Sequence, residues 1–280
     1  LSRLEYRGYD SAGVAILDGE KLTIEKKEGK LQVLKDHLTN SKINGNIGIG
    51  HTRWATHGVP NDVNAHPHSD NQNEFAIIHN GIIENYAEMK DDLLKEGFVF
   101  ESDTDTEVVA VELGNQWTGR LLETVTNVAK KLDGTYALVV TSTKEPGTIV
   151  AGRMMSPLVL GVGEGETFLA SDSAAILEHT NKMIFLENGD FVEITNGKFK
   201  LFDENMNEIS REIQEIDWKV SEAEKSGYDH FMYKEILEQA EVIERTISGR
   251  LDNGSEEFTR DSNKPKECEK LRRSGSRTTH

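Results

Sequence analysis

The sequence is short of cysteine, of long apolar runs and of positive charge, and each shortage excludes a class of protein. The single cysteine, Cys268, lies in a charged and polar tail, so an internal disulfide or a thiolate metal site is not possible. No apolar run approaches the roughly 18 residues that a membrane-spanning helix needs, and the first residues lack the pattern of a secretory signal. We therefore expect no membrane association and a cytoplasmic location.

Acidic residues outnumber basic ones, 49 to 32, which gives a formal net charge of −17 at pH 7. A surface of this sign repels nucleic-acid phosphates, so we expect no nucleic-acid partner. The 280 residues are enough to bury the core of one large domain or of two ordinary ones.

Helical and strand patterns are mixed along the chain without a repeating βαβ rhythm, which favours an α+β fold of stacked antiparallel sheets with outer helices. Short apolar runs predict strands at residues 14–17, 22–25, 98–100, 137–140, 148–151, 158–162, 168–170, 183–186, 191–194 and 199–202. Helical spacing predicts helices at 31–38, 86–96, 105–111, 122–132 and 230–249, a short helix at 171–179 and the last turns of a helix at 1–7.

Polar side chains gather where two further strand patterns end. Residues 51–58 carry a guanidinium, an indole, hydroxyls and two imidazoles, and the pattern over 75–83 ends in Asn80-Gly81. A guanidinium fork fits a carboxylate, an amide donates a hydrogen bond, and a glycine lets the backbone approach a ligand closely. The sequence therefore predicts a site for a small polar molecule that bears a carboxylate.

Two charged residues are candidates for the two ends of an amino acid. Arg53 is either a surface ion-pair partner or a fork for a carboxylate. Thr104 and Glu107 form a capping-box pattern, which places Asp105 in the first turn of a helix. There Asp105 either complements the helix dipole or receives a ligand ammonium.

Three other chemistries have weaker support. His51, His57 and the run His66-Pro67-His68 could converge on a metal, but no His-Glu-x-x-His element or nearby cysteine accompanies them, so we expect no metal and no cofactor. The glycines at 161–165 resemble a phosphate loop, yet a strand pattern follows them where a helix is required, and we expect a turn. No Gly-x-Ser-x-Gly elbow of a serine hydrolase is present.

Five motifs in order, at residues 4–13, 51–58, 64–68, 79–85 and 104–107, resemble the glutaminase domain of the glutamine–fructose-6-phosphate aminotransferases, which are class II glutamine amidotransferases. The likeness extends through residues 156–159, 170–172 and 230–236 to residue 252. It implies an N-terminal-nucleophile hydrolase fold, a four-layer αββα sandwich of two antiparallel sheets. It also implies that the substrate is glutamine, hydrolysed to supply ammonia for glucosamine 6-phosphate synthesis.

The resemblance assigns a role to each matching position. Arg53 would bind the α-carboxylate of glutamine and Asp105 its α-ammonium, while Asn80 through its side chain and Gly81 through its backbone N–H would form the oxyanion hole. The remaining assignments are Trp54 as a guard of the ammonia exit, Thr56, His57 and His66 as further substrate-binding residues, and Arg7 beside the nucleophile.

The family nucleophile is a cysteine at the mature N-terminus whose own α-amino group acts as the base. The sequence begins after that position, and neither Ser2 nor Cys268 replaces it, so we expect residues 1–280 to be inactive as a glutaminase. Two alternatives stay open: a non-catalytic glutamine-binding module, and the glutaminase domain of another class II enzyme such as amidophosphoribosyltransferase.

The expected domain organisation follows the same resemblance. Residues 1–209 would form the glutaminase domain, and residues 210–252 a linker and helix leading to sugar-isomerase domains that the sequence does not include. Fructose 6-phosphate would bind only through those domains, and the parent enzyme would be a homo-oligomer. Residues 253–280 have little to bury, which predicts a disordered tail.

Overall fold

The computed structural model describes residues 1–19, 21–39, 41, 43–216, 232–233, 236–239 and 243. The chain divides into two compact units, Leu1–Ala223 and Glu224–His280. The helix predicted over 230–249 lies mostly outside the described residues, and the tail predicted over 253–280 lies wholly outside them. Within the described ranges, no helix is both long enough and apolar enough to cross a bilayer.

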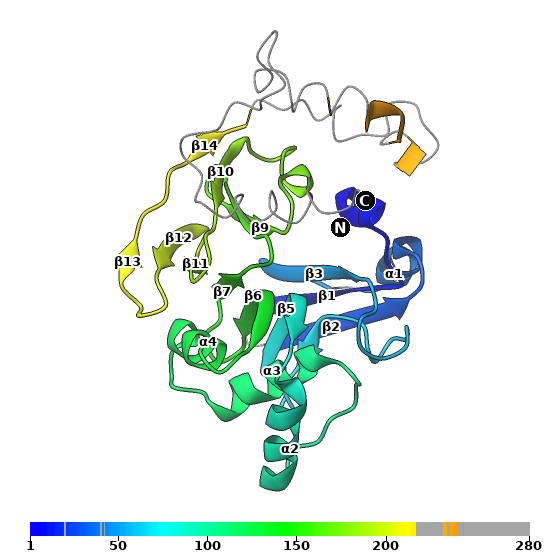
Figure 1. The fold of residues 1–280 in the computed structure, drawn as a ribbon, viewed down its shortest axis with the longest axis vertical. Coiled ribbons are helices and arrows are strands. Elements are labelled where there is room, and N and C mark those ends of the chain that lie inside the picture. Colours follow the sequence, from blue (N-terminus) through cyan, green and yellow to red (C-terminus); the bar gives the residue numbers. More distant parts are fainter. Residues whose placement is uncertain are drawn as a thin grey trace, which may run out of the picture. The chain divides into compact units, whose positions relative to one another are not determined.

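Three antiparallel sheets form the first unit (Figure 1). The three-stranded sheet has the order β2-β1-β3, with β1 (Ser11–Asp18), β2 (Lys21–Glu28) and β3 (Ile47–Arg53). The four-stranded sheet has the order β14-β10-β8-β9, with β8 (Val159–Val162), β9 (Thr167–Ala170), β10 (Lys182–Phe185) and β14 (Gln214–Glu215). The seven-stranded sheet has the order β13-β12-β11-β7-β6-β5-β4, with β4 (His68–Ser69), β5 (Phe75–Ile83), β6 (Gly134–Ser142), β7 (Thr148–Met154), β11 (Phe191–Thr195), β12 (Lys198–Phe202) and β13 (Glu208–Ile209).

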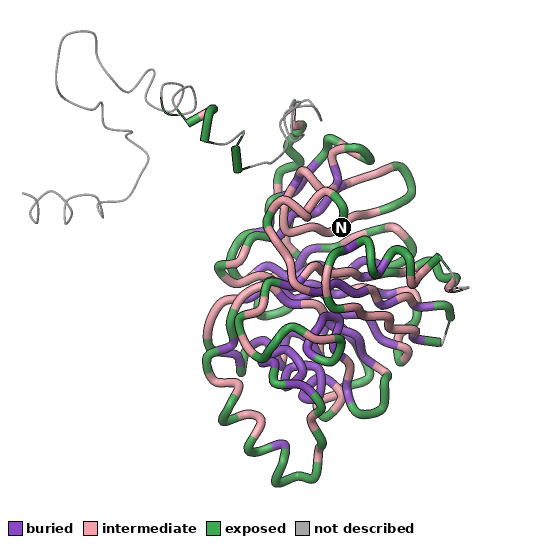
Figure 2. Tube along the Cα trace, turned by 90° about the vertical axis from the view of Figure 1, so that its right-hand side faces the viewer, coloured by how far each residue is buried: buried purple, intermediate pink, exposed green. Residues whose placement is uncertain are grey.

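Strand β6, an interior strand of the seven-stranded sheet, shows how the layers stack. Its alternate residues face opposite sides, as in any strand, and both sides are buried. Leu138 and Val140 pack in one core with α3 (Asp105–Asn115) and α4 (Leu121–Ala129), whereas Ala137 and Val139 pack in a second core with the two smaller sheets. Buried backbone therefore runs through the middle of the unit in Figure 2.

Helices complete the sandwich on both outer sides. Helix α1 (Leu31–Thr39) packs Leu31 and Leu34 against Ala12 of β1. Helix α2 (Tyr86–Glu96) lies against α3 and ends at Gly97, whose φ of 94° gives the left-handed cap that glycine adopts without strain. The expected order of helix, sheet, sheet, helix is confirmed, but one of the two predicted sheet layers is divided into the three-stranded and the four-stranded sheet.

The division leaves an outer strand on each of the two smaller sheets. Among the described residues, β3 and β9 are the outer strands of their sheets on the sides that border one cavity, and both contribute residues to its lining. In the part of the chain that the structure describes, no backbone hydrogen bonds between β3 and β9 join these sheets into one.

Three local predictions are wrong. Residues 98–100 form no strand, because the Asn71 side chain bonds both backbone groups of Val99, at 2.7 and 3.2 Å, in place of a strand partner. The short helix expected at 171–179 is only the 3₁₀ turn η2 (Ser173–Ala175), begun by Asp172. The turns at 1–7 are the 3₁₀ helix η1 (Ser2–Arg7) and not an α-helix, with no side-chain cap at their start.

Candidate active site

One cavity of about 670 Å³ opens among β3, β9, the middle of the seven-stranded sheet and the two 3₁₀ helices. Its volume lies in the range of small-molecule sites, about 300–1,000 Å³. All nine residues singled out from the sequence line it: Arg7, Arg53, Trp54, Thr56, His57, His66, Asn80, Gly81 and Asp105. The structure therefore brings the whole predicted set together.

Strands β3 and β5 supply the polar floor of this cavity. Arg53 is the last residue of β3, as expected, but Asn80 and Gly81 lie inside β5, which continues to Ile83. The sequence pattern predicts them at the end of the strand, and this prediction is wrong. Gly81 has a φ of 131°, and a Cβ on it would lie 2.0 Å from the carbonyl oxygen of Thr135, so only glycine fits there.

Arg53 is almost completely buried, with 3% of its surface exposed. Its Nη2 donates to the carbonyl oxygens of His57 and Gly58. Its Nη1 lies 3.7 Å from the carboxylate of Asp10 and has no hydrogen-bond partner within the described residues. Burial lowers the pKa of Arg53, while the charges of Asp10 and Asp105 oppose that shift. A buried guanidinium nitrogen that lacks an acceptor is a candidate donor to a ligand anion.

Asp105 supplies negative charge to the same cavity. The Thr104 side chain accepts from the backbone N–H of Glu107 at 3.3 Å, which confirms the predicted start of α3 and holds Asp105 in its first turn. The reciprocal half of the capping box is absent, because Glu107 accepts instead from the N–H groups of Glu101 and Ser102. Asp105 Oδ2 accepts from the N–H of Ile83 at 2.9 Å, which ties α3 to β5.

Four histidines lie together beside these residues, and we call them the histidine cluster: the buried His66, His68 and His79 and the partly exposed His51. The rings of His51 and His66 stack with centroids 4.4 Å apart, and His68 meets His66 edge-on at 4.9 Å. Burial is the first cause that lowers the pKa of all four, in the case of His51 to about 4. The cluster is therefore neutral at pH 7.

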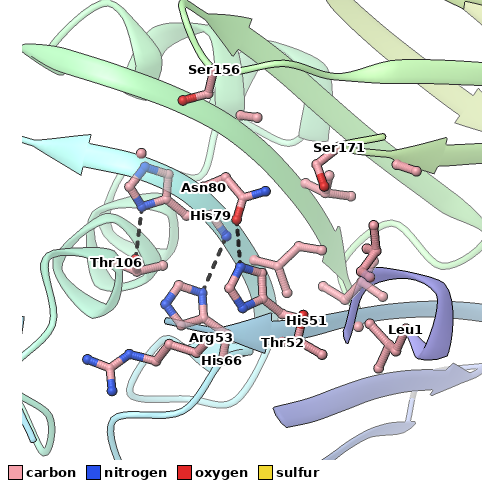
Figure 3. Close-up of a pocket in the computed structure, with 18 of the residues that line it drawn as sticks. Leu1, His51, Thr52, Arg53, His66, His79, Asn80, Thr106, Ser156 and Ser171 are labelled. Carbon is pink, nitrogen blue, oxygen red and sulfur yellow. Dashed lines mark hydrogen bonds between the residues drawn. The ribbon is translucent and has the colours of Figure 1, made fainter. Parts of the chain in front are cut away.

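Several polar contacts of the cluster are visible in Figure 3. His51 Nε2 lies 2.8 Å from Asn80 Oδ1, and His79 Nδ1 lies 3.0 Å from Thr106 Oγ1. The backbone N–H of His79 donates to His66 Nδ1 at 3.4 Å. Within the described residues, no group of three or more histidine, cysteine, aspartate or glutamate side chains is arranged to hold a metal ion.

The remaining predicted residues that line the cavity, Arg7, Trp54, Thr56 and His57, are more exposed than Arg53 and Asp105. Trp54 is 69% exposed, and its ring covers Gly8, where a Cβ would clash with it at 2.1 Å. The His57 ring meets Tyr86 edge-on at 5.1 Å. Arg7 donates to the carboxylate of Asp172 at 2.8 Å, so η1 is linked by an ion pair to the start of η2.

Sequence reasoning missed three residues that organise the site. Asp10 accepts from the N–H of Ala55 and lies beside Arg53, His51 contacts Asn80, and Asp172 holds Arg7. Asp10 and Asp172 fall within the recognised motifs, but a motif does not say which side chains meet across strands. Only the antiparallel pairing of Ser11 with Arg53 shows that the ends of β1 and β3 are adjacent.

The fold and the cavity define a class of protein, an amidotransferase of the N-terminal-nucleophile hydrolase type. The family model described as a glutamine amidotransferase domain matches residues 35–233, which is more than half of the chain, and the chain belongs to this family.

Two relatives that are nearly half identical to the chain share the name glutamine–fructose-6-phosphate aminotransferase (isomerizing). The chain is 48% identical over 248 residues to the protein of Fusobacterium nucleatum, with 89% of the chain and 41% of the relative covered. It is 49% identical over 251 residues to that of Clostridium perfringens, with 90% and 41% covered. The chain therefore spans about two fifths of the length of these relatives.

Among solved structures, the chain is similar to glutamine phosphoribosylpyrophosphate amidotransferase from B. subtilis. The TM-score is 0.63 and the identity 28%, with 74% of this chain and 46% of the other covered. This similarity supports the expected sandwich of antiparallel sheets between helices.

Proposed function

We propose that the cavity binds L-glutamine, with Arg53 on its α-carboxylate and Asp105 on its α-ammonium. The observation that carries this proposal is that one cavity holds a buried cation with an unpartnered donor nitrogen, a buried carboxylate and the Asn80-Gly81 pair. The two charges fit the ends of a free amino acid, and the amide and backbone donors suit a carboxamide oxygen.

The other lining residues have supporting roles in this proposal. Asn80 through its side-chain amide and Gly81 through its N–H stabilise the oxyanion that forms when the carboxamide is attacked. Trp54 guards the exit of ammonia, Arg7 lies beside the nucleophile, and Thr56, His57 and His66 line the glutamine site.

In the whole protein we propose that the released ammonia is transferred to fructose 6-phosphate, giving glucosamine 6-phosphate. The names and the identity of the relatives, near 48%, support this acceptor. It would bind in parts that lie outside the matched two fifths. A homo-oligomeric parent enzyme and a cytoplasmic location stay predictions from the sequence.

A second candidate acceptor is phosphoribosyl pyrophosphate, because a solved amidotransferase with that name is similar in fold. Its 28% identity to the chain is well below the 48% of the glutamine–fructose-6-phosphate aminotransferase from Fusobacterium nucleatum. This difference favours fructose 6-phosphate as the ammonia acceptor. Assaying the full-length gene product with each acceptor separates the two, and amination of phosphoribosyl pyrophosphate alone would overturn the first assignment.

We call the pair Arg53 and Asp105 the charge clamp. Isothermal calorimetry on residues 1–280 with glutamine analogues tests whether this pair binds the two charged ends of the ligand. We expect L-glutamine to bind, and we expect 4-carbamoylbutanoate, which lacks the ammonium, and 4-aminobutanamide, which lacks the carboxylate, to bind more weakly. Each missing charge-assisted contact is worth about 1.5–3 kcal/mol, which is about 10- to 150-fold in Kd. Equal affinities for all three compounds would contradict the clamp.

The variant Arg53→Ala tests one half of the clamp directly. We expect it to weaken L-glutamine binding by about 1.5–3 kcal/mol and to leave the affinity for 4-aminobutanamide, which has no carboxylate, nearly unchanged. Arg120→Ala is the matched control, because Arg120 makes a surface ion pair with Glu193 at 3.1 Å and does not line the cavity. An unchanged Kd for L-glutamine in Arg53→Ala would show that Arg53 does not bind the α-carboxylate of glutamine.

A further inference from the structure

The contact between His51 and Asn80 fixes which atom of each side chain faces the other. His51 belongs to β3 and Asn80 to β5, and His51 Nε2 lies 2.8 Å from Asn80 Oδ1. A carboxamide oxygen only accepts hydrogen bonds, so the proton of the pair is on His51 Nε2. His51 is therefore the donor, in the tautomer that leaves Nδ1 without a proton.

The surroundings of His51 fit this tautomer. Its Nδ1 is buried and has no hydrogen-bond partner among the described residues, although the residue as a whole keeps some exposure. Its ring stacks on His66, and the nearby charge of Arg53 further disfavours an imidazolium. A neutral imidazole has a single N–H, and here that N–H is directed at Asn80.

This donor decides how the Asn80 amide is turned. Rotation by a half turn about the last side-chain bond would exchange its oxygen and nitrogen with little change in shape. The bond from His51 holds the oxygen toward β3, so the NH₂ group points away from His51 into the cavity, as Figure 3 shows. The opposite orientation would present an oxygen to the cavity, which repels a carbonyl oxygen or an oxyanion.

We infer that His51 is a positioning residue, which holds the Asn80 amide with its NH₂ group toward the carboxamide oxygen of the substrate. The inference rests on the proposed function, in which Asn80 donates to that oxygen. It assigns to His51 a role in recognising the carboxamide and none in holding the two charged ends of the amino acid.

A purely structural role would have a different signature. If His51 only filled space in the histidine cluster, its replacement would disturb every ligand of the cavity to a similar degree. If it orients Asn80, the loss falls on ligands with a carboxamide oxygen. A glutamine side chain at this position also carries an N–H donor and should restore the orientation, whereas leucine should not.

The test uses residues 1–280, the variants His51→Leu and His51→Gln, and two ligands, L-glutamine and L-2-aminopentanoate. The second ligand keeps both charged ends but has no carboxamide. We expect His51→Leu to weaken L-glutamine binding about three- to tenfold, the worth of one hydrogen bond, and to leave L-2-aminopentanoate binding unchanged. We expect His51→Gln to bind both ligands as the parent chain does.

The outcomes separate this inference from the proposed function. Equal losses for both ligands in His51→Leu, or no loss for L-glutamine, would overturn the role of His51 and leave the clamp standing. Failure of the parent chain to bind either ligand would overturn the proposed function itself. A long-range ¹H–¹⁵N spectrum gives a ligand-free readout: a proton on Nε2 of His51 supports the inference, and a proton on Nδ1 alone overturns it.

Discussion

Extending the chain at its N-terminus with a family-like segment that begins with cysteine is expected to produce glutaminase activity. Among the described residues, β3 and β9 are outer strands that line the cavity, and an outer strand offers backbone hydrogen-bond partners to an added extended segment. Such a segment would bring a thiol and its own α-amino base to the Asn80-Gly81 pair. Glutamate released from L-glutamine, measured by a coupled assay, is the readout.

The expected difference is large, because removing a nucleophile from an acyl-transfer enzyme costs about 10⁶ in turnover. The matched control is the same extension with alanine in place of the first cysteine, which should bind L-glutamine without releasing glutamate. A folded, extended chain that binds L-glutamine but leaves it intact would count against the assigned oxyanion hole.

Acidification is expected to destabilise the protein strongly between about pH 6.5 and pH 4. The histidines of the cluster are neutral in the folded state and have lowered pKa values, whereas in the unfolded chain their pKa is about 6.5. The unfolded state therefore binds more protons in this window, and stability is full above pH 6.5 and falls as the pH drops. For His51, with a folded pKa of about 4, the loss by pH 4 is about 3 kcal/mol.

Urea unfolding followed at a series of pH values measures this effect. The variant His66→Phe keeps an aromatic ring against His51 but cannot be protonated, so its stability should fall less steeply with pH. His179→Gln, at an exposed position outside the cluster, should keep the slope of the parent chain. Parallel pH profiles for the parent and His66→Phe would show that the cluster does not control acid unfolding.

Local signals in the sequence predicted most elements of the first unit correctly. Helix α2 has apolar residues at helical spacing and a glycine stop, and Thr104 marks the start of α3, so both follow from short-range chemistry. The strand prediction for residues 98–100 is wrong because the backbone of Val99 bonds the side chain of Asn71. Hydrophobic periodicity carries no information on such a partner. The division of one layer into two sheets is likewise a matter of long-range pairing.

The candidate site likewise has a part that the sequence predicted and a part that it did not. Arg53, Asn80 and Asp105 could be grouped because their residue types, at predicted strand ends and at a helix start, suit the charged ends and the carboxamide of an amino acid such as glutamine. The partners that orient them could not, since Asp10 reaches Arg53 only through the β1–β3 pairing and His51 reaches Asn80 only where β3 approaches β5. The sequence therefore indicates the candidate binding residues, but it does not indicate the contacts that hold them in place.

The hydrogen bond from the Ile83 N–H to the Asp105 carboxylate also connects α3 to β5. In the proposed function the ammonium of glutamine binds the same carboxylate, which would strengthen this contact on the strand that carries Asn80 and Gly81. Glutamine binding would then stabilise the contact between α3 and β5, and a more stable contact would in turn favour glutamine binding.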